Sequence, residues 1–426
     1  MMDIVSPESV GLSSSRLERV SGWLEEQIAT ERLAGASVLI GRHGSVAFFE
    51  ARGLADQASA RSFTRDTIVR LYSMTKPVTT VAAMMLYEEG RFQLDDPVAR
   101  YLPEFASTEV WAGGEAPLSE TVPVATPMTV RHLMTHTSGL TYGFMQTNVV
   151  DAAYREAELD FPGGPGPLDA QIRRLAEIPL ICQPGSEWNY SVSIDVLGRL
   201  VEIWSGVDLD AFFRERLFEP LDMHDMGFHV AAENHDRFAA CYSPASGGDL
   251  SNVGRAPDLA AQAARTGGLK LQDPAQGSAF LTPARVFAGG GGLTGSMRDY
   301  VRFCQMLMNG GELEGARILS PKTIDYMRRN HLPENRDMAA MGQPVWSETS
   351  YDGIGFGLGW AVVIDPVKAQ IITSVGEHHW GGAASTFFWL DPEEELFVIL
   401  LTQLMPSSTY PLRRELRQRV YQAIVG

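Results

Sequence analysis

Ser73 and Lys76, in the stretch LYSMTK (71–76), are the residues whose types and spacing most directly allow covalent chemistry. On a helix, residues three apart share a face, so the hydroxyl and the amine could come within hydrogen-bonding distance. A serine hydroxyl is inert at neutral pH without an adjacent base, and a lysine becomes that base if burial or neighbouring charge lowers its pKa. A serine at a helix start also lies near exposed backbone N–H groups that can hold an oxyanion.

The Ser-x-x-Lys spacing alone is weak evidence, because it often arises by chance as a solvated pair. The following residues strengthen it. Lys76 leads directly into PVTTVAAMML (77–86), whose apolar character predicts a buried helix. Lysine is rarely buried without a partner or a function, so this position favours a catalytic role.

The composition excludes several other functions. A formal net charge of −17 argues against binding to nucleic acid or to an anionic membrane, since both require a basic face. The start of the chain has neither the basic nor the apolar region of a secretory signal, and no apolar run approaches the roughly 18 residues of a membrane span. We therefore expect a soluble, cytoplasmic protein. Three sparse cysteines, Cys182, Cys241 and Cys304, predict buried structural thiols.

Apolar periodicity and glycine stops predict the elements that must position Ser73. Helices are expected over 14–30, 78–90, 128–140, 193–206, 296–311 and 412–425. A β-hairpin is expected over 36–53, and further strands over 357–365, 369–375, 384–392 and 395–404. The segments 161–167 and 243–292 are expected to be a loop and a long irregular stretch, the latter of a kind that often forms the wall of a site.

Strands at both ends of the chain with helices between them predict an α/β fold of the α+β type. Residues 1–95 and 312–426 would form one discontinuous domain around an antiparallel sheet, and residues 96–311 an inserted, mostly helical domain. We expect the active site in the cleft between the two domains.

Residues 71–104 resemble the active-site helix of serine β-lactamases, penicillin-binding proteins and their esterase relatives, for which Ser-x-x-Lys is a signature. Three later stretches resemble the same group in the expected order: VRHLMTHTSGL, GGGGLTGSMRDYVRFCQMLMNGG, and GFGLGW followed by HHWGGAASTFFWLDP. The resemblance covers nearly the whole chain. It implies a β-lactamase/transpeptidase-like fold, with Ser73 as nucleophile and Lys76 as base.

The second motif of this superfamily is a tyrosine followed two residues later by asparagine. Here WNYSVSIDVLG supplies Tyr190, but Val192 stands at the asparagine position. A phenol near a lysine ammonium loses its proton more easily. The resemblance therefore implies that Tyr190 shares the base role with Lys76 and later protonates the leaving group; the alternative is a core tyrosine with a satisfied hydroxyl.

The third motif of β-lactamases is Lys-Thr-Gly, yet this chain has Trp380-Gly381-Gly382. The missing lysine would pair with the carboxylate of a β-lactam or peptide, whereas tryptophan offers an apolar wall. The register could also be His379-Trp380-Gly381, the His-x-Gly of other relatives, but WGGAAST aligns better. These departures, together with Val192, resemble the family VIII carboxylesterases and imply neutral ester substrates.

By the same comparison, the backbone N–H groups of Ser73 and Ala383 would form the oxyanion hole. Trp380, Gly381 and Gly382 are expected to line the substrate site. Tyr72, Val192 and His379 are expected to contribute to it as well.

We therefore predict a serine carboxylesterase that acts through an acyl-enzyme on short-chain esters, without a metal or organic cofactor. The alternatives are β-lactamase or D-amino-acid peptidase activity, acyl transfer to a small acceptor, or a scaffold or ligand sensor that kept the fold. A sensor would be expected to lose its catalytic residues, and these are present. The partner is a small ester, and the sequence leaves the oligomeric state open.

Two further patterns have a simpler explanation. His132 and His136 have the i, i+4 spacing of a metal pair on a helix, but the glutamate of H-E-x-x-H and a third ligand are missing. The glycine-rich stretches at 289–295 and 355–359 lack the strand and helix context of a nucleotide site, so tight turns at the rim of the cleft are expected.

Overall fold

The computed structural model describes residues 3–160, 166–247, 265–342, 351–407 and 409–426. The predicted loop at 161–167 and the irregular stretch at 243–292 lie partly outside these ranges. Among the described residues, no helix is both long and apolar enough to cross a membrane.

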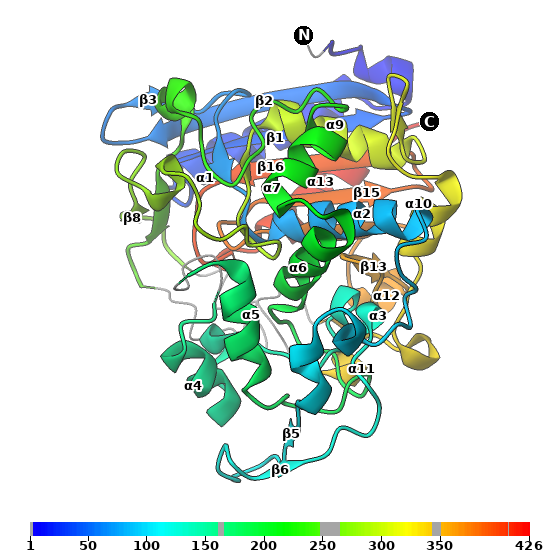
Figure 1. The fold of residues 1–426 in the computed structure, drawn as a ribbon. Helices are drawn as coiled ribbons and strands as arrows, with labels where there is room; N and C mark the ends of the chain where they lie inside the picture. The colour runs from blue at the N-terminus through cyan, green and yellow to red at the C-terminus, as the bar shows by residue number, and fades with distance from the viewer. Residues whose placement is uncertain (1–2, 161–165, 248–264, 343–350, 408) are drawn as a thin grey trace.

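An eight-stranded antiparallel sheet forms the upper part of the molecule in the view of Figure 1. Its spatial order is β12-β13-β14-β15-β16-β1-β2-β3. The strands are β1 (Gly35–Arg42), β2 (Ser45–Asp56), β3 (Arg61–Ser62), β12 (Ile354–Phe356), β13 (Ala361–Val363), β14 (His378–Gly381), β15 (Phe387–Asp391) and β16 (Leu396–Thr402). The two ends of the chain join where β1 pairs with β16, with Ala36 opposite Thr402.

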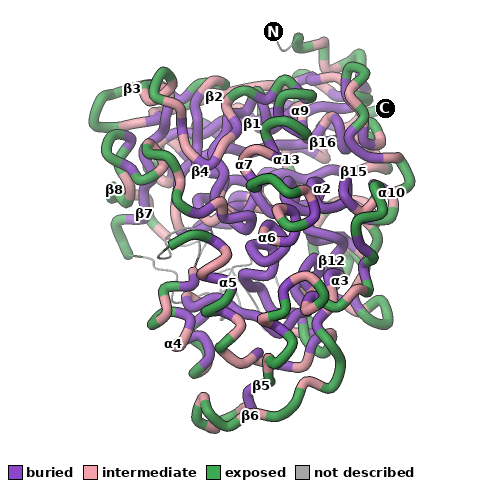
Figure 2. Tube along the Cα trace, viewed as in Figure 1, coloured by how far each residue is buried: buried purple, intermediate pink, exposed green. Residues whose placement is uncertain are grey.

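Helices cover both faces of this sheet, which explains why β16 is a continuous apolar run. Successive side chains of a strand point to opposite faces. Leu396, Val398 and Leu400 pack with α1 (Ser14–Ala29) and α13 (Leu412–Tyr421). Phe397, Ile399 and Leu401 belong to the cluster that contains α2 (Thr75–Glu88) and α9 (Met297–Met308). The buried trace in Figure 2 accordingly runs through the sheet and α2.

The remaining elements are mostly short helices, several of which lie below α2 in Figure 1. They are α3 (Val130–Met134), α4 (Val149–Glu156), α5 (Leu168–Ala176), α6 (Ser193–Ser205), α7 (Leu209–Phe213), α10 (Pro321–Met327), α11 (Met338–Met341) and α12 (Pro366–Ala369). Short strand pairs join β4 (Val69–Arg70) to β9 (Thr294–Gly295), β5 (Val110–Trp111) to β6 (Thr121–Val122), β7 (Cys241–Pro244) to β8 (Leu269–Asp273), and β10 (Glu312–Leu313) to β11 (Ala316–Arg317).

The predicted fold class is confirmed, as are the helices over 14–30, 193–206 and 296–311 to within a few residues. The predicted hairpin over 36–53 is also present as β1 and β2. The helix expected from residue 78 begins earlier, at Thr75, so Lys76 lies in its first turn.

Three predicted elements are wrong. The helix expected over 128–140 ends at Met134, and His136 has a φ of 54°, which a continuing helix does not allow. The strand expected over 369–375 is a loop after α12, and its Ile372 and Val375 are exposed rather than buried in the sheet. The strand expected over 357–365 is shorter: only β13, Ala361–Val363, forms within that range, and residues 357–360 are the turn that joins it to β12.

Candidate active site

Ser73 lies in a 3₁₀ turn, η2 (Tyr72–Met74), that runs directly into α2. The preceding Tyr72 has a φ of 45°, in the left-handed region that a tyrosine rarely adopts. Such strain is concentrated at functional sites, because the surrounding structure must enforce it. Here β4 and β9 hold the incoming chain, since the Leu71 N–H donates to the Leu293 carbonyl. The nucleophile is thus presented from a sharply turned backbone at the start of a buried helix.

Two side chains meet at the Ser73 hydroxyl. Lys76 Nζ lies 3.2 Å from Ser73 Oγ, as expected for residues three apart at a helix start. The Tyr190 hydroxyl donates to the same oxygen at 2.6 Å. The structure therefore brings Tyr190 to the Ser73–Lys76 pair, although it lies 117 residues beyond Ser73 in the chain.

Lys76 has two further hydrogen-bond acceptors that the sequence did not reveal. Its Nζ donates to the Gly290 carbonyl at 2.6 Å and to the Tyr142 hydroxyl at 3.0 Å. The amine also lies 4.5 Å from the centre of the Tyr190 ring. These contacts fix the direction of the amine, because a flexible lysine side chain would otherwise sample many rotamers.

The pKa of Lys76 is well below that of an ordinary lysine. Burial is the main cause, since the side chain is 1% exposed and removal from water disfavours the ammonium. The negative charge of Asp195 acts in the opposite direction and raises the pKa in part. A substantial neutral fraction near physiological pH is what a general base requires.

The phenol of Tyr190 behaves differently from the sequence-based expectation. Burial raises the pKa of Tyr190 above its usual range, and the hydrogen bond to Ser73 only partly opposes this effect. Burial therefore outweighs the interactions that would ease its deprotonation, and the base role shared with Lys76 stays a prediction. Tyr190 is a neutral hydrogen-bond donor in this state, which leaves Lys76 as the group able to accept a proton.

The segment after α3 explains why Tyr142 and Tyr190 lie side by side. Instead of continuing the helix, residues 135–142 run along residues 181–192. The Asn189 N–H donates to the His136 carbonyl, and the Val192 N–H donates to the Thr141 carbonyl. The rings of Tyr142 and Tyr190 are consequently 5.3 Å apart, on the same side of Lys76. The helix that the sequence suggested would have separated them.

The β14–β15 turn supplies the opposite side of the site. A Cβ added at Gly382 would lie 2.2 Å from the Leu71 carbonyl oxygen, so only glycine allows the turn to approach the nucleophile segment this closely. Trp380 packs against Tyr190 and Phe356, with ring centres 5.6 and 5.3 Å away. Within the described residues, neither the Ser73 N–H nor the Ala383 N–H has a hydrogen-bond acceptor.

Three other predicted site residues have no hydrogen bond to the Ser73 hydroxyl. His379 is on β14, where neighbours point to opposite faces, and its Nδ1 lies 2.6 Å from Glu377 Oε1. Arg417 donates to the same carboxylate, so His379 belongs to a buried ion cluster. Val192 is fully buried at the start of α6, and Tyr72 makes an edge-to-face contact with Phe280.

The histidine pair does not form the helical motif considered above. His132 lies in α3, where its ring nitrogen accepts from the Thr129 N–H, whereas His136 lies beyond the end of that helix. Across the described ranges, no group of three His, Cys, Asp or Glu side chains is arranged to hold a metal ion. The three cysteines are buried and unpaired.

Three residues of the site were missed by the sequence analysis: Tyr142, Asp195 and Gly290. Tyr142 follows the stretch 128–140, for which a helix is expected. Gly290 lies in the four-glycine run at 289–292, for which a tight turn at the rim of the cleft is expected. Asp195 is 1% exposed, a rare position for an aspartate. The sequence signal that could have identified Asp195 as a site residue is its position five residues after Tyr190.

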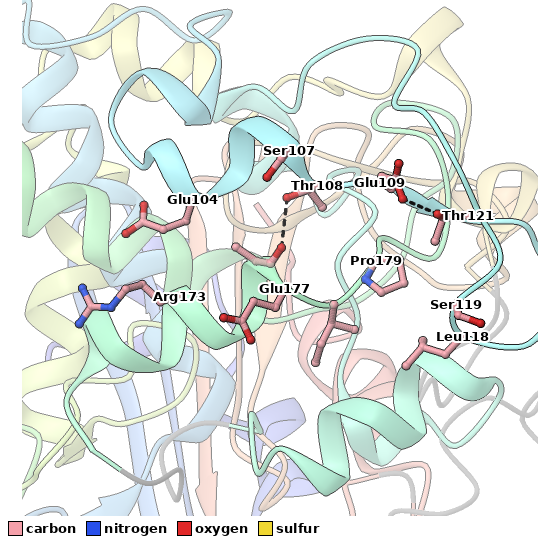
Figure 3. A pocket seen from close by; sticks show the side chains of 12 residues that line it. Glu104, Ser107, Thr108, Glu109, Leu118, Ser119, Thr121, Arg173, Glu177 and Pro179 are labelled. Carbon is pink, nitrogen blue, oxygen red and sulfur yellow. Dashed lines mark hydrogen bonds between the residues drawn. The ribbon is translucent and has the colours of Figure 1, made fainter.

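A separate pocket of about 920 Å³ lies near β5, β6 and α5. Figure 3 shows its polar lining, which includes Glu104, Glu109, Glu177 and Arg173. It is an open surface groove and contains none of the residues around Ser73. Thr121 Oγ1 donates to the Glu109 carboxylate in this groove, but the contact is exposed and no lysine, histidine or tyrosine is among the lining residues, so the Ser73 site is the better candidate for the chemistry.

Comparison with known proteins agrees with this geometry. The sequence matches the family described as beta-lactamase over residues 20–422. The chain belongs to the β-lactamase family. The predicted resemblance is therefore confirmed, and it extends over nearly the whole length.

Relatives within this family include enzymes named for reactions on esters. Esterase EstB of Burkholderia gladioli is 34% identical over 430 residues, which cover 98% of this chain and 98% of that enzyme. The solved structure of EstCE1, described as a hydrolase with promiscuous acyltransferase activity, has a TM-score of 0.75 at 30% identity and covers 96% of this chain and 99% of that one. Simvastatin synthase LovD of Aspergillus terreus shares the fold at 23% identity, with a TM-score of 0.76 and coverage of 96% and 98%.

Proposed function

We propose that the protein is a serine carboxylesterase that acts through an acyl-enzyme. The observation that carries this proposal is the Ser73 hydroxyl, which is bonded both by a buried lysine and by a tyrosine phenol. An alcohol becomes nucleophilic only when a base removes its proton, and this arrangement provides the base. The similarity to EstB over the whole chain supports the same conclusion.

Acylation begins when neutral Lys76 accepts the proton of Ser73 as Oγ attacks the ester carbonyl carbon. The N–H groups of Ser73 and Ala383 stabilise the resulting oxyanion. When the bond to the alcohol breaks, Tyr190 donates its proton to the leaving oxygen and regains one from the Lys76 ammonium. Water then attacks the acyl-enzyme with the same residues as acid and base.

The substrates are small neutral esters with short acyl chains. Trp380 stands where a penicillin-recognising enzyme carries a lysine, so a substrate carboxylate would find an apolar wall there. Aromatic rings crowd the hydroxyl, because Tyr142 stacks on Phe144 and Tyr190 packs against Trp380.

We also propose that the chain forms two domains. Residues 1–95 and 312–426 make up the domain that contains the sheet, and residues 96–311 make up the mostly helical domain. The site lies where these two domains adjoin.

The decisive experiment is labelling with a fluorophosphonate followed by peptide mapping, together with hydrolysis of p-nitrophenyl acetate by the variant Ser73→Ala. We expect the label on Ser73, and loss of both labelling and turnover in the variant. Ser37→Ala is the control, since Ser37 is also buried, with 0% exposure against 9% for Ser73, but lies in β1. Labelling at another residue, or turnover by a folded Ser73→Ala, would show that the mechanism is wrong.

Acyl transfer to a small alcohol or amine is a second activity that the same acyl-enzyme allows. The description of EstCE1 as a hydrolase with acyltransferase activity favours it. Adding acceptors to the ester assay and analysing the products separates transfer from hydrolysis. Nitrocefin hydrolysis, measured beside p-nitrophenyl acetate, tests the alternative of β-lactamase activity, which we expect to be much the weaker.

A further inference from the structure

Asp195, in the first turn of α6, has a buried carboxylate with incomplete hydrogen bonding. Its Oδ1 accepts from the Gly290 N–H at 2.9 Å. Its Oδ2 is buried and, within the described residues, has no hydrogen-bond partner. A buried carboxylate oxygen without a donor is costly, so its presence in a native structure requires an explanation.

Gly290 connects this carboxylate to the catalytic lysine. The same residue whose N–H donates to Asp195 accepts the Lys76 amine through its carbonyl, at 2.6 Å. A Cβ added at Gly290 would lie 2.3 Å from Asp195 Oδ2, so the carboxylate rests against the glycine backbone. Asp195, the backbone of Gly290 and Lys76 thus form one chain of contacts that ends at Ser73.

A purely structural role does not explain why Asp195 is buried. An acidic residue in the first turn of a helix is stabilised by the helix dipole, but an exposed position would provide the same benefit. Asp299 illustrates that role: it lies in the first turn of α9, is fully buried and accepts from the Asp225 and Met226 N–H groups. Its Oδ1, like Asp195 Oδ2, has no hydrogen-bond partner among the described residues, so the unpaired oxygen does not by itself distinguish the two aspartates. Asp299 faces no catalytic cation, whereas the charge of Asp195 acts directly on Lys76.

We propose that Asp195 is a positioning residue that holds Lys76 beside Ser73 through the Gly290 backbone and supplies the negative charge that stabilises the Lys76 ammonium formed during catalysis. This inference rests on the proposed esterase function. Without that charge, burial alone would make Lys76 a weak base, because an ammonium in an apolar surrounding is unstable. The Asp195 carboxylate opposes the lowering of the Lys76 pKa by burial. It does so without a direct ion pair to Lys76, because such a pair would hold the lysine permanently protonated.

The other groups around Lys76 stay neutral at physiological pH. Burial raises the pKa values of the Tyr142 and Tyr190 phenols, while burial and then the charge of Lys76 lower the pKa of His136. Burial also raises the pKa of Asp195, to about 6, although the charge of Lys76 opposes this, so its carboxylate is mostly ionised at pH 7. Asp160 is a further carboxylate whose charge reaches Asp195, and burial raises its pKa too. The charge most directly coupled to Lys76 is therefore that of Asp195.

The test is Asp195→Asn, which can keep an oxygen for the Gly290 N–H but removes the charge. We expect KM to change little and the plateau kcat to fall by about tenfold or more. The acid limb of the pH profile of kcat/KM should move to lower pH by about one unit, the scale of shift that a nearby charge produces. Asp195→Glu, which restores the charge, should return the limb toward that of the wild type. An active Asp195→Asn with an unmoved acid limb would overturn the inference.

Two further variants keep the test sharp. Asp299→Asn makes the same change at the matched buried aspartate and should leave the acid limb in place. An acid limb that moves in Asp299→Asn as far as in Asp195→Asn would also overturn the inference.

If Asp195→Asn does not fold, Gly290→Ala replaces it, because the added Cβ forces the Asp195 carboxylate away with every charge retained. We expect Gly290→Ala to lower kcat and move the limb in the same direction. Wild-type protein that neither hydrolyses esters nor labels at Ser73 would instead disprove the proposed function itself.

Discussion

The two phenols beside Lys76 provide a comparison between buried tyrosines whose hydroxyls bond different members of the Ser73–Lys76 pair. Tyr190 and Tyr142 are 2% and 4% exposed, and each hydroxyl bonds a member of the Ser-Lys pair. Tyr190 bonds the nucleophile at 2.6 Å, whereas Tyr142 bonds only the amine, at 3.0 Å. We predict that Tyr190→Phe and Tyr142→Phe will have very different effects on turnover.

The magnitudes follow from what each hydroxyl does. Tyr190→Phe removes the proton donor for the leaving alcohol, and losing a general acid–base typically lowers the rate about 10²–10⁴-fold. Tyr142→Phe removes one of three acceptors of Lys76. A single neutral hydrogen bond contributes about 1 kcal/mol, which corresponds to a loss of roughly fivefold.

The assay is the steady-state hydrolysis of an alkyl ester, ethyl acetate, by both variants, with the thermal unfolding of each as a check on folding. p-Nitrophenyl acetate, whose leaving group departs without a proton, should partly rescue Tyr190→Phe but should not rescue Tyr142→Phe. Equal losses in the two variants, or less than a tenfold loss in a folded Tyr190→Phe, would refute the roles assigned here.

Three other predictions concern the site and its support. Burial lowers the pKa of Lys76, so kcat/KM of the wild type should rise with pH through a limb far below the usual lysine value of 10.5, and Lys76→Arg, whose side chain cannot lose its proton, should be inactive at every pH. Glu377→Gln should lower the free energy of unfolding by about 3–5 kcal/mol at pH 7, because it leaves the buried Arg417 without its carboxylate. Burial opposes ionisation of Glu377, but Arg417 and then His379 outweigh it and lower its pKa well below 4.5. That stability is present above the unfolded pKa and is lost as the pH falls through the folded one, so urea titrations should show the gap between wild type and Glu377→Gln narrowing below about pH 4.5. Finally, Trp380→Ala should raise kcat/KM for p-nitrophenyl butyrate relative to the acetate, and an unchanged ratio would argue against Trp380 as the wall that limits chain length.

Local patterns predicted the elements whose contacts lie nearby in the chain. The hairpin over 36–53 and the helix over 193–206 have clear periodicity and turn residues, and both form as expected. The stretch 369–375 has the same β-rich composition but is a loop, because Pro366 and the Asp365 cap begin a short helix just before it. The helix expected over 128–140 fails for a different reason: the carbonyls of residues beyond 134 accept backbone hydrogen bonds from N–H groups within 181–192.

The sequence by itself determined the family and predicted the nucleophile and its lysine, because Ser73 and Lys76 are three residues apart and the remaining motifs follow in a fixed order. Only the tertiary structure decided how the lysine is controlled. Tyr142, Asp195 and Gly290 reach Lys76 from segments 66, 119 and 214 residues away. Each residue is unremarkable in its own segment. Their function follows from burial around one amine, which removes water and makes a few polar groups decide whether that amine carries a proton.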